Sequence, residues 1–194
     1  RAVIASRVGD DDPGRDAVHQ ARELGVDTSL VQTDVELFTG AVEVAIADGE
    51  PEFRIIEHVA WDRIDLSPAL LETAGTVDCV CFGTLAQRSG VSRRSLHGLL
   101  DAAPHVLAFC DINLRTGCYR EPTVRASMER ADVLKLNEAE VAEAGRLIGL
   151  PADDPVEFCR MVMADYAPRL CVVTLGEAGA LAVPSNGDPH YAPG

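Results

Sequence analysis

From residue 67 onward, short apolar runs alternate with segments of helical pattern, and this alternation constrains the fold more than any other feature. The sequence predicts strands over residues 77–82, 106–110, 133–136 and 170–175, and helices over 67–71, 92–100, 122–131, 137–148 and 155–166. A last strand over 180–183 is expected to pair back through a turn at 176–179. Continuous apolar runs are typical of strands buried on both faces of a parallel sheet. The alternation therefore predicts an α/β fold with a doubly wound sheet flanked by helices.

The first 57 residues depart from this pattern. A strand is predicted over residues 2–8, and the acidic cluster that follows is expected to cap a helix closed by Gly25. Apolar and polar residues then alternate on both sides of Asp48-Gly49, which is a hairpin turn signal. The sequence therefore predicts a β-hairpin over residues 41–57 outside the sheet, where it could form a lid or a dimer-forming flap.

Composition excludes some classes of protein. The net charge is -14, which disfavours nucleic-acid binding, because nucleic-acid-binding proteins usually present a basic patch. No apolar run approaches the roughly 20 residues that span a bilayer, and the start of the sequence shows no signal-peptide pattern. The six cysteines lack C-x-x-C metal spacing. They are predicted to be buried free thiols in a reducing cytoplasm, with Cys79 and Cys81 facing the same side of one strand.

The stretch over residues 106–115 changes abruptly from an apolar run to the polar motif Asp111-x-Asn113-x-Arg115. In open parallel sheets, ligands bind beyond the carboxyl ends of the strands, which is where this motif would lie. If the backbone stays extended, the three side chains point the same way, because strand side chains alternate with period two. Arginine favours bidentate contact with carboxylate or phosphate. The motif therefore indicates either one side of a ligand cleft or a polar loop with turn chemistry.

A second motif, Asn137-x-x-Glu140, stands at a predicted strand-to-helix junction. Asn is a favoured N-cap and Glu three residues later completes a capping box, so the motif has a structural interpretation. The functional interpretation is that the helix N-terminus and the Glu140 carboxylate organise a phosphate and its Mg²⁺. Lys135 lies at the end of the preceding strand, where its point charge would serve a phosphate site.

The third motif, Thr174-x-Gly176-x-x-Gly179, follows an apolar strand. Glycines at this place allow a backbone turn to approach a nucleotide closely, although a hairpin with Gly in its turn would look the same. The sequence contains neither G-x-G-x-x-G nor G-x-x-x-x-G-K-[ST]. Dinucleotide-binding and P-loop interpretations are therefore rejected.

Taken together and in order, the motifs identify a family. They are Val8-Gly9-Asp10-Asp11…Gly14, Leu24-Gly25-Val26-Asp27, Thr39-Gly40, Asp111-x-Asn113-x-Arg115, Lys135-Leu136-Asn137-x-x-Glu140 and Val173-Thr174-x-Gly176-x-x-Gly179. This series resembles the ribokinase-like carbohydrate kinases, also called the PfkB family, over nearly the whole length. The stretches 82–88 and 60–62 look most like the fructokinase-like branch.

The resemblance implies an ATP-dependent, Mg²⁺-assisted sugar kinase with a ribokinase-like fold and a small β lid. It implies the following site residues: Asp111, Asn113, Arg115, Trp61 and Arg88 on the substrate side; Lys135, Asn137, Thr174, Gly176 and Gly179 at the nucleotide; and Glu140 at the metal. Phosphoryl transfer needs mainly positioning and charge neutralisation, which these residue types supply. The hairpin would belong to the family's lid, which often dimerises, and Trp61 could instead be a core or interface residue.

The sequence also departs from the family. Members have a glycine-rich sugar-binding segment before the region where this sequence begins, and a Gly-Ala-Gly-Asp loop with the catalytic base after the region where it ends. Residues 1–194 are therefore expected to be one α/β domain incomplete at both ends, with no catalytic residue present and no sugar phosphorylation by this stretch alone. The acceptor is expected to be fructose or a similar keto-sugar. A nucleoside kinase, or a non-catalytic sugar- or nucleotide-binding protein derived from a kinase, remains an alternative, and a flavodoxin-like module is disfavoured.

Overall fold

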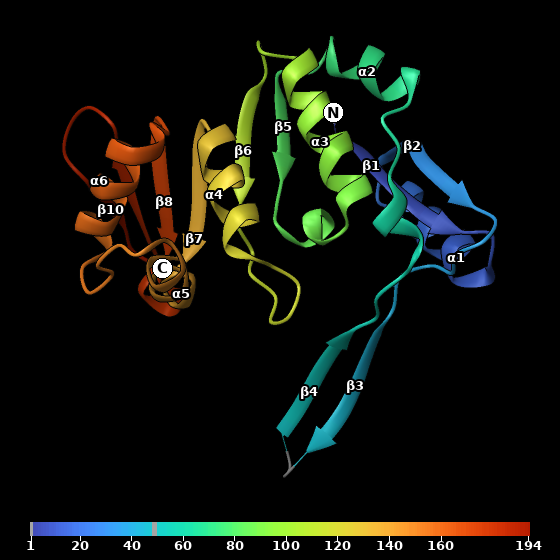
Figure 1. Ribbon diagram of the computed structural model, residues 1–194, viewed down its shortest axis with the longest axis horizontal. Helices are drawn as coiled ribbons and strands as arrows, with labels where there is room; N and C mark the ends of the chain where they lie inside the picture. The colour runs from blue at the N-terminus through green and yellow to red at the C-terminus, as the bar shows by residue number, and fades with distance from the viewer. Residues whose placement is uncertain (1, 48–49) are drawn as a thin grey trace. The chain divides into compact units, whose positions relative to one another are not determined.

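Two compact units make up the computed structural model, which describes residues 2–47 and 50–194 (Figure 1). The first unit consists of Arg1–Thr73 with Ser89–Leu99, and the second of Ala74–Arg88 with Leu100–Gly194. The helices of the chain are α1 (Asp12–Glu23), α2 (Pro68–Ala74), α3 (Gly90–Ala102), α4 (Glu121–Arg130), α5 (Glu138–Ile148) and α6 (Pro155–Tyr166). Its strands are β1 (Val3–Gly9), β2 (Asp27–Asp34), β3 (Val42–Ala47), β4 (Glu50–Ile55), β5 (Cys79–Phe82), β6 (Leu107–Asp111), β7 (Val133–Asn137), β8 (Leu170–Thr174), β9 (Ala180–Pro184) and β10 (His190–Ala192).

The second unit is built on a six-stranded sheet in the order β10-β9-β8-β7-β6-β5. Strands β5 to β8 run parallel, whereas β9 and β10 are antiparallel to their neighbours. Helices α4, α5 and α6 pack against one another and against β6 to β9. The fully buried side chains of this layer include Phe158, Met128, Leu134, Leu136 and Val173. The α/β fold with a mainly parallel sheet flanked by helices, which the alternation predicted, is confirmed.

Local sequence explains where these helices begin and end. Helix α6 begins after Asp154, whose side chain accepts the backbone N–H groups of the first turn, and has Pro155 at its first position. Helix α5 begins after Asn137 and ends at Gly149, whose φ of 76° lies in the left-handed region that glycine adopts without strain. Both helices therefore have the bounds that their cap residues predict.

The first unit contains the parallel pair β1 and β2, helix α1 and the β3–β4 hairpin. Asp11 caps α1 by accepting the N–H of Gly14 at 2.9 Å, and it also accepts the N–H and hydroxyl of Thr39 at 2.8 and 2.5 Å. The Thr39 hydroxyl oxygen in turn accepts the N–H of Gly9 at 2.8 Å. These hydrogen bonds hold the pKa of Asp11 below its usual value. One carboxylate thus joins the end of β1, the start of α1 and the approach to the hairpin.

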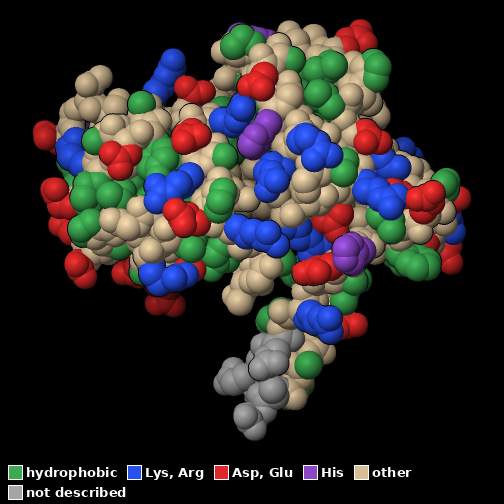
Figure 2. Space-filling model, viewed as in Figure 1, with side chains coloured by type: hydrophobic (Ala, Val, Ile, Leu, Met, Phe, Trp, Pro, Cys, Tyr) green, Lys and Arg blue, Asp and Glu red, His purple; other side chains and the backbone are tan. Residues whose placement is uncertain are grey.

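The predicted hairpin is confirmed as β3 and β4, which pair antiparallel; the Asp48-Gly49 turn lies outside the described residues. Register pairs Val42 with Ile55 and Val44 with Phe53, so these apolar side chains share one face. Val42, Val44 and Phe53 are largely exposed. Figure 1 shows the hairpin extending away from β1 and β2, and Figure 2 shows hydrophobic side chains on its described part.

Three sequence-based expectations about elements are wrong or incomplete. Strands β2 and β10 were not predicted, because β2 is rich in polar residues and β10 has three residues in a turn-rich tail. Ser92, which is a residue type typical of N-caps and was expected to begin the helix predicted over 92–100, does not cap α3. It lies inside the helix, where its hydroxyl donates to the carbonyl of Trp61 at 2.8 Å and accepts the N–H of Ile64 at 3.0 Å. The Ser89 hydroxyl instead accepts the N–H of Val91 at the helix start.

The prediction that all six thiols are buried is wrong for two of them. Cys110, Cys118, Cys159 and Cys171 are buried, whereas Cys79 and Cys81 are exposed, and all six are free. Burial depends on position in the sheet: β5, which carries the exposed pair, is an edge strand with one neighbour, β6. The expected alternation holds, since Cys79 and Cys81 flank Val80 on one strand. Among the described helices, none is long and apolar enough to cross a membrane.

Candidate functional site

Polar side chains follow three neighbouring parallel strands at their carboxyl ends. In the register of the sheet, Asp111 of β6 pairs with Lys135 of β7, and Asn137 of β7 pairs with Thr174 of β8. Lys135 and Asn137 are two residues apart on one strand, so the four side chains share one face of the sheet. The structure thus brings together one substrate-side residue and three nucleotide-side residues expected from the sequence. This edge is also where open parallel sheets bind their ligands.

An ion pair joins the two central members of this group. The Lys135 Nζ atom lies 3.1 Å from Asp111 Oδ1 and 3.2 Å from Oδ2, and both side chains are about one-third exposed or less. An ammonium group has three donors, and the carboxylate engages it through both oxygens. The charges of the pair offset each other, while Lys135 remains accessible enough to meet a second anion.

Beyond Asp111 the backbone leaves the extended conformation, so the expected alternation of the Asp111, Asn113 and Arg115 side chains is wrong. Strand β6 ends at Asp111, and Asn113 has a φ of 42°. This left-handed conformation is one that Asn tolerates better than most residues. Asn113 and Arg115 are exposed in the following loop. The polar-loop interpretation therefore describes the backbone, and it leaves both side chains open to a ligand.

The two weaker substrate-side candidates lie in different units. In the second unit, Arg88 ends a 3-10 turn (Leu85–Arg88), and its Nη1 atom lies 3.8 Å from the Cys118 sulfur. Cys118 in turn donates its N–H to the carbonyl of Arg115, so Arg88 adjoins the loop that carries Arg115. In the first unit, Trp61 lies in a 3-10 turn (Ala60–Arg63) and its indole packs so closely on Gly40 that a side chain there would collide with the ring.

The Asn137-x-x-Glu140 motif forms a complete capping box. Asn137 Oδ1 accepts the N–H of Glu140 at 2.9 Å, and Glu140 Oε2 accepts the N–H of Asn137 at 2.8 Å. The second carboxylate oxygen, Oε1, accepts the N–H of Leu114 at 2.8 Å. Glu140 is buried. Its carboxylate thus holds both the start of α5 and the loop after β6, which the sequence alone did not predict.

The Thr174-x-Gly176-x-x-Gly179 motif makes the hairpin between β8 and β9. Thr174 pairs with Ala180 across this hairpin, and a 3-10 turn (Gly176–Ala178) closes it. Gly176 and Gly179 have φ values of 58° and 105°, and a Cβ atom on Gly179 would collide with the carbonyl oxygen of Ala192. The glycines are therefore required by the turn itself.

Thr84 and Gln87 were not predicted as functional residues, but their hydrogen bonds hold the backbone beside the candidate site. Both are fully buried in the second unit. The Thr84 hydroxyl donates to the carbonyl of Ile112 at 2.7 Å, and Gln87 Nε2 donates to the carbonyl of Gly83 and the hydroxyl of Ser127. Their signal in the sequence is a polar cluster directly after the apolar run of β5. It was visible only as a feature of the fructokinase-like branch.

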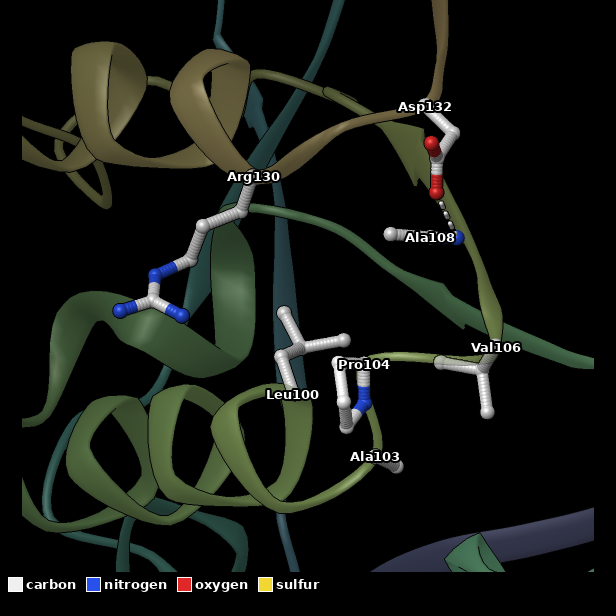
Figure 3. A pocket seen from close by; sticks show the side chains of 7 residues that line it. All are labelled: Leu100, Ala103, Pro104, Val106, Ala108, Arg130 and Asp132. Atoms are coloured by element: carbon white, nitrogen blue, oxygen red, sulfur yellow. Dashed lines mark hydrogen bonds between the residues drawn. The ribbon is translucent and has the colours of Figure 1, made fainter.

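A cavity of about 180 Å³ lies at the other end of the same sheet (Figure 3). It is lined by Leu100, Ala103, Pro104, Val106, Ala108, Arg130 and Asp132. Its polar groups are engaged: Asp132 Oδ2 accepts the N–H of Ala108 at 2.9 Å, and Arg130 Nη1 donates to Asp101 at 2.7 Å. Ala108 stands near the beginning of β6 and Asp132 just before β7. The cavity is therefore at the amino ends of the strands and separate from the candidate site.

A resident metal centre built from side chains alone is not supported. Within residues 2–47 and 50–194, no group of three or more His, Cys, Asp or Glu residues could hold a metal ion. The one acidic residue that the sequence assigns to Mg²⁺, Glu140, already accepts two backbone N–H groups. Mg²⁺ usually keeps several waters and binds through one or two carboxylates plus substrate phosphates. The residues therefore fit an ion held mainly by phosphates and water rather than by a cluster of side chains.

Comparisons with known proteins agree with this fold. The model of the pfkB family of carbohydrate kinases matches residues 1–194. A fructokinase of Klebsiella pneumoniae is 28% identical over 197 aligned residues, which cover 95% of this chain and 61% of that protein. Two solved fructokinases are similar in fold: one of Xylella fastidiosa with bound ATP (TM-score 0.85, 16% identity, 97% of this chain and 59% of that one) and one of Vibrio cholerae O395 with fructose, ADP and a calcium ion (TM-score 0.79, 24% identity, 100% and 63%).

The curated relatives are longer than this chain, which spans 48–61% of their length. The match to the family nevertheless extends from the first residue to the last. The fold, the order of the motifs and their convergence at one edge of the sheet lead to the same assignment. The chain belongs to the pfkB family of carbohydrate kinases.

Proposed function

We propose that this chain is part of an ATP-dependent sugar kinase that transfers the γ-phosphate of ATP to a hydroxyl of fructose or a similar keto-sugar. Family membership supports the class of reaction. One structural observation carries the assignment to this edge of the sheet: the Asp111–Lys135 pair stands beside the N-terminus of α5. A helix N-terminus presents free N–H groups and the positive end of a dipole, which attract phosphate.

In the transfer, the sugar hydroxyl oxygen forms a bond to the γ-phosphorus while the bond from that phosphorus to the β-phosphate oxygen breaks. ADP leaves, and the hydroxyl proton passes to a base that we do not assign to any residue of this chain. The contribution of these residues is to position the two substrates and to offset negative charge. Lys135 would share its ammonium between Asp111 and the phosphates, because its three donors allow both contacts.

The nucleotide would lie along the ends of β7 and β8. The cap leaves Asn137 Nδ2 as a donor toward this edge, since only Oδ1 takes part in the capping box. Thr174, Gly176 and Gly179 form the turn that would border the nucleotide. The associated Mg²⁺ would neutralise phosphate charge and meet Glu140 through water.

The acceptor sugar would lie at the loop after β6. Asp111, Asn113 and Arg115 offer it an acceptor, an amide and a guanidinium, and Arg88 adjoins the same loop. Arginine is suited to bidentate contact with an anion, so Arg115 would also serve the transferred phosphoryl group. Trp61 stays a substrate-side prediction.

Lys135 allows a direct test of nucleotide binding because it is the only lysine in the sequence. We would treat the protein with an acyl phosphate of ATP, which transfers its acyl group to a nearby amine and releases ATP. Acylation should map to Lys135, and excess Mg-ATP should block it. Lys135→Arg is the control, in which the site-specific label should disappear. Labelling of Lys135 that excess Mg-ATP leaves unchanged would contradict the proposed nucleotide site.

Calorimetry would test the acceptor. We expect fructose to bind in the presence of Mg-ADP, and Arg115→Gln to weaken that binding about tenfold by removing a charged contact. Arg120→Gln, an exposed arginine of the same loop, is the matched control. Binding of adenosine but not fructose would favour a nucleoside kinase. Binding of both ligands by an intact protein that releases no ADP would favour a non-catalytic binding protein.

We further propose that the β3–β4 hairpin joins two copies of the chain. A two-stranded hairpin is marginally stable in water, and this one exposes an apolar face. Val44→Lys should convert a dimer to a monomer in sedimentation velocity, whereas Glu43→Lys on the opposite face should not. A wild-type monomer at about 100 μM would contradict this proposal.

Six free thiols support a cytoplasmic location.

A further inference from the structure

Glu140 makes one contact that helix capping does not explain. Its Oε2 atom accepts the N–H of Asn137 at 2.8 Å, which closes the capping box. Its Oε1 atom accepts the N–H of Leu114, also at 2.8 Å, from a loop 26 residues earlier in the sequence. The side chain is 6% exposed, so water does not compete freely for either oxygen. A charged acceptor with two backbone donors forms bonds roughly twice as strong as those between neutral groups.

The loop that receives this contact has few other long-range ties. Ile112 is anchored on both sides: its N–H donates to the carbonyl of Lys135 at 3.0 Å, and its carbonyl accepts the Thr84 hydroxyl at 2.7 Å. Asn113 then turns the chain through a left-handed conformation. The next fixed point is the N–H of Leu114 on Glu140. Arg115 and Cys118 follow, joined to each other by a local turn.

We propose that Glu140 is a positioning residue that fixes the acceptor loop, Asn113 to Arg115, relative to the phosphate-binding N-terminus of α5. This inference rests on the proposed function for its consequence, but the contact itself does not. This one carboxylate fixes the position of the acceptor loop relative to the start of α5, because it holds the α5 cap with one oxygen and the loop with the other. Direct metal ligation would require it to release or share one of these bonds.

Glu140→Gln separates the two bonds of Glu140. A Gln at the third position of a capping box can keep its oxygen on the N-cap N–H. Its other terminal group is then an amide donor, which faces the Leu114 N–H and cannot accept it. The variant should therefore keep the helix cap and lose the tie to the loop. Glu138→Gln is the matched control, since Glu138 is an exposed residue in the same first turn and undergoes the same change of charge.

Amide hydrogen exchange tests the contact. In the wild-type protein the Leu114 N–H should be protected at least tenfold relative to the exposed residues of its loop. Glu140→Gln should abolish that protection while the amides of Val141 to Ala144 stay within twofold of wild type, and Glu138→Gln should change neither. An unprotected Leu114 N–H in the wild-type protein would overturn the proposal, as would equal loss of protection in the loop and in the helix.

Calorimetry tests the consequence. Glu140→Gln should weaken fructose binding five- to tenfold, and more than it weakens Mg-ATP binding, because the loop is loosened and the helix end is not. A loss confined to Mg-ATP affinity would instead assign Glu140 to the metal and overturn the positioning role. If no protein in the series binds fructose, the proposed acceptor fails, whereas the exchange result still decides whether Glu140 holds the loop.

Discussion

Each of the two compact units of this chain is stabilised internally by a different kind of interaction. All of the largest fully buried side chains belong to the unit of Ala74–Arg88 and Leu100–Gly194, where three helices cover a six-stranded sheet. The unit of Arg1–Thr73 and Ser89–Leu99 contains most of the exposed large hydrophobic residues, among them Val35, Phe38 and Phe53. Apolar packing therefore defines the second unit, whereas the first depends more on polar contacts.

Carboxylates carry those polar contacts in the first unit. Asp11 accepts three hydrogen bonds from Gly14 and Thr39. Asp34 is 1% exposed and accepts the N–H groups of Glu36 and Leu37, both at 2.9 Å. Carboxylates that accept several backbone N–H groups specify one backbone path because each unmade bond is costly. The comparison shows that the chain fixes its fold by burying apolar surface in one unit and by directional hydrogen bonds to carboxylates in the other.

Two natural probes make the comparison measurable. The only tryptophan, Trp61, lies in the first unit, and all six cysteines lie in the second. Tryptophan fluorescence therefore reports on the first unit, and the reactivity of the buried thiols Cys110, Cys159 and Cys171 reports on the second.

The largest effect is expected from Phe158→Ala, which removes a fully buried ring from α6. Loss of such a ring costs about 3–5 kcal/mol of unfolding free energy. In urea titrations the buried thiols should become reactive at much lower denaturant, while the Trp61 transition moves less. Phe38→Ala, at a residue 78% exposed, is the control and should cost less than about 0.5 kcal/mol. Equal shifts of both probes would contradict the contrast between the units.

A smaller effect, confined to the first unit, is expected from Thr39→Val. This isosteric change removes the hydroxyl that donates to Asp11 and accepts the N–H of Gly9. Losing one charge-assisted bond and leaving one N–H unpaired should cost about 2 kcal/mol in the Trp61 transition. Thr33→Val makes the same chemical change at an exposed position of β2 and serves as control. If the thiol transition shifts more than the Trp61 transition, these polar contacts do not stabilise mainly the first unit, and the prediction is wrong.

Acid should affect the two units in order. The N–H groups of Glu36 and Leu37, and the nearby Arg7 guanidinium, lower the pKa of Asp34. Because the folded pKa lies below the unfolded value of 3.8, this stabilisation is present above about pH 4 and is lost as pH falls through the folded pKa.

The corresponding group of the second unit is Glu143, whose pKa is lowered to about 2 by Arg146 and then Tyr119. That ion pair lies near the surface, where water and salt screen it, so it should contribute less. On lowering pH from 5 to 2, Trp61 fluorescence should change before dithiodipyridine reaches the buried thiols. Asp34→Asn should flatten the pH dependence of the Trp61 signal. Thiol exposure before the Trp61 transition would contradict this order.

The same contrast explains what the sequence could predict. Apolar runs and cap residues located the parallel strands and helices of the second unit, because burial and capping leave local patterns. The polar strand β2 leaves no such pattern, since its place depends on pairing with β1. The motifs put Asp111, Lys135, Asn137 and Thr174 at the ends of apolar runs, and the register of the sheet brings these ends side by side. The contact of Glu140 with Leu114 joins residues 26 positions apart and could not be deduced from spacing.

The smallest effect on stability is expected at the exposed thiols of β5. Replacing Cys79 and Cys81 by Ser should change unfolding by less than about 0.5 kcal/mol, because both side chains already face solvent. With maleimide at neutral pH, intact mass should show two adducts on the native protein, mapped to Cys79 and Cys81. Partial desolvation raises the pKa of Cys81, which should slow its reaction with maleimide. Protection of both thiols in the native protein would show that something covers this edge of the sheet in solution.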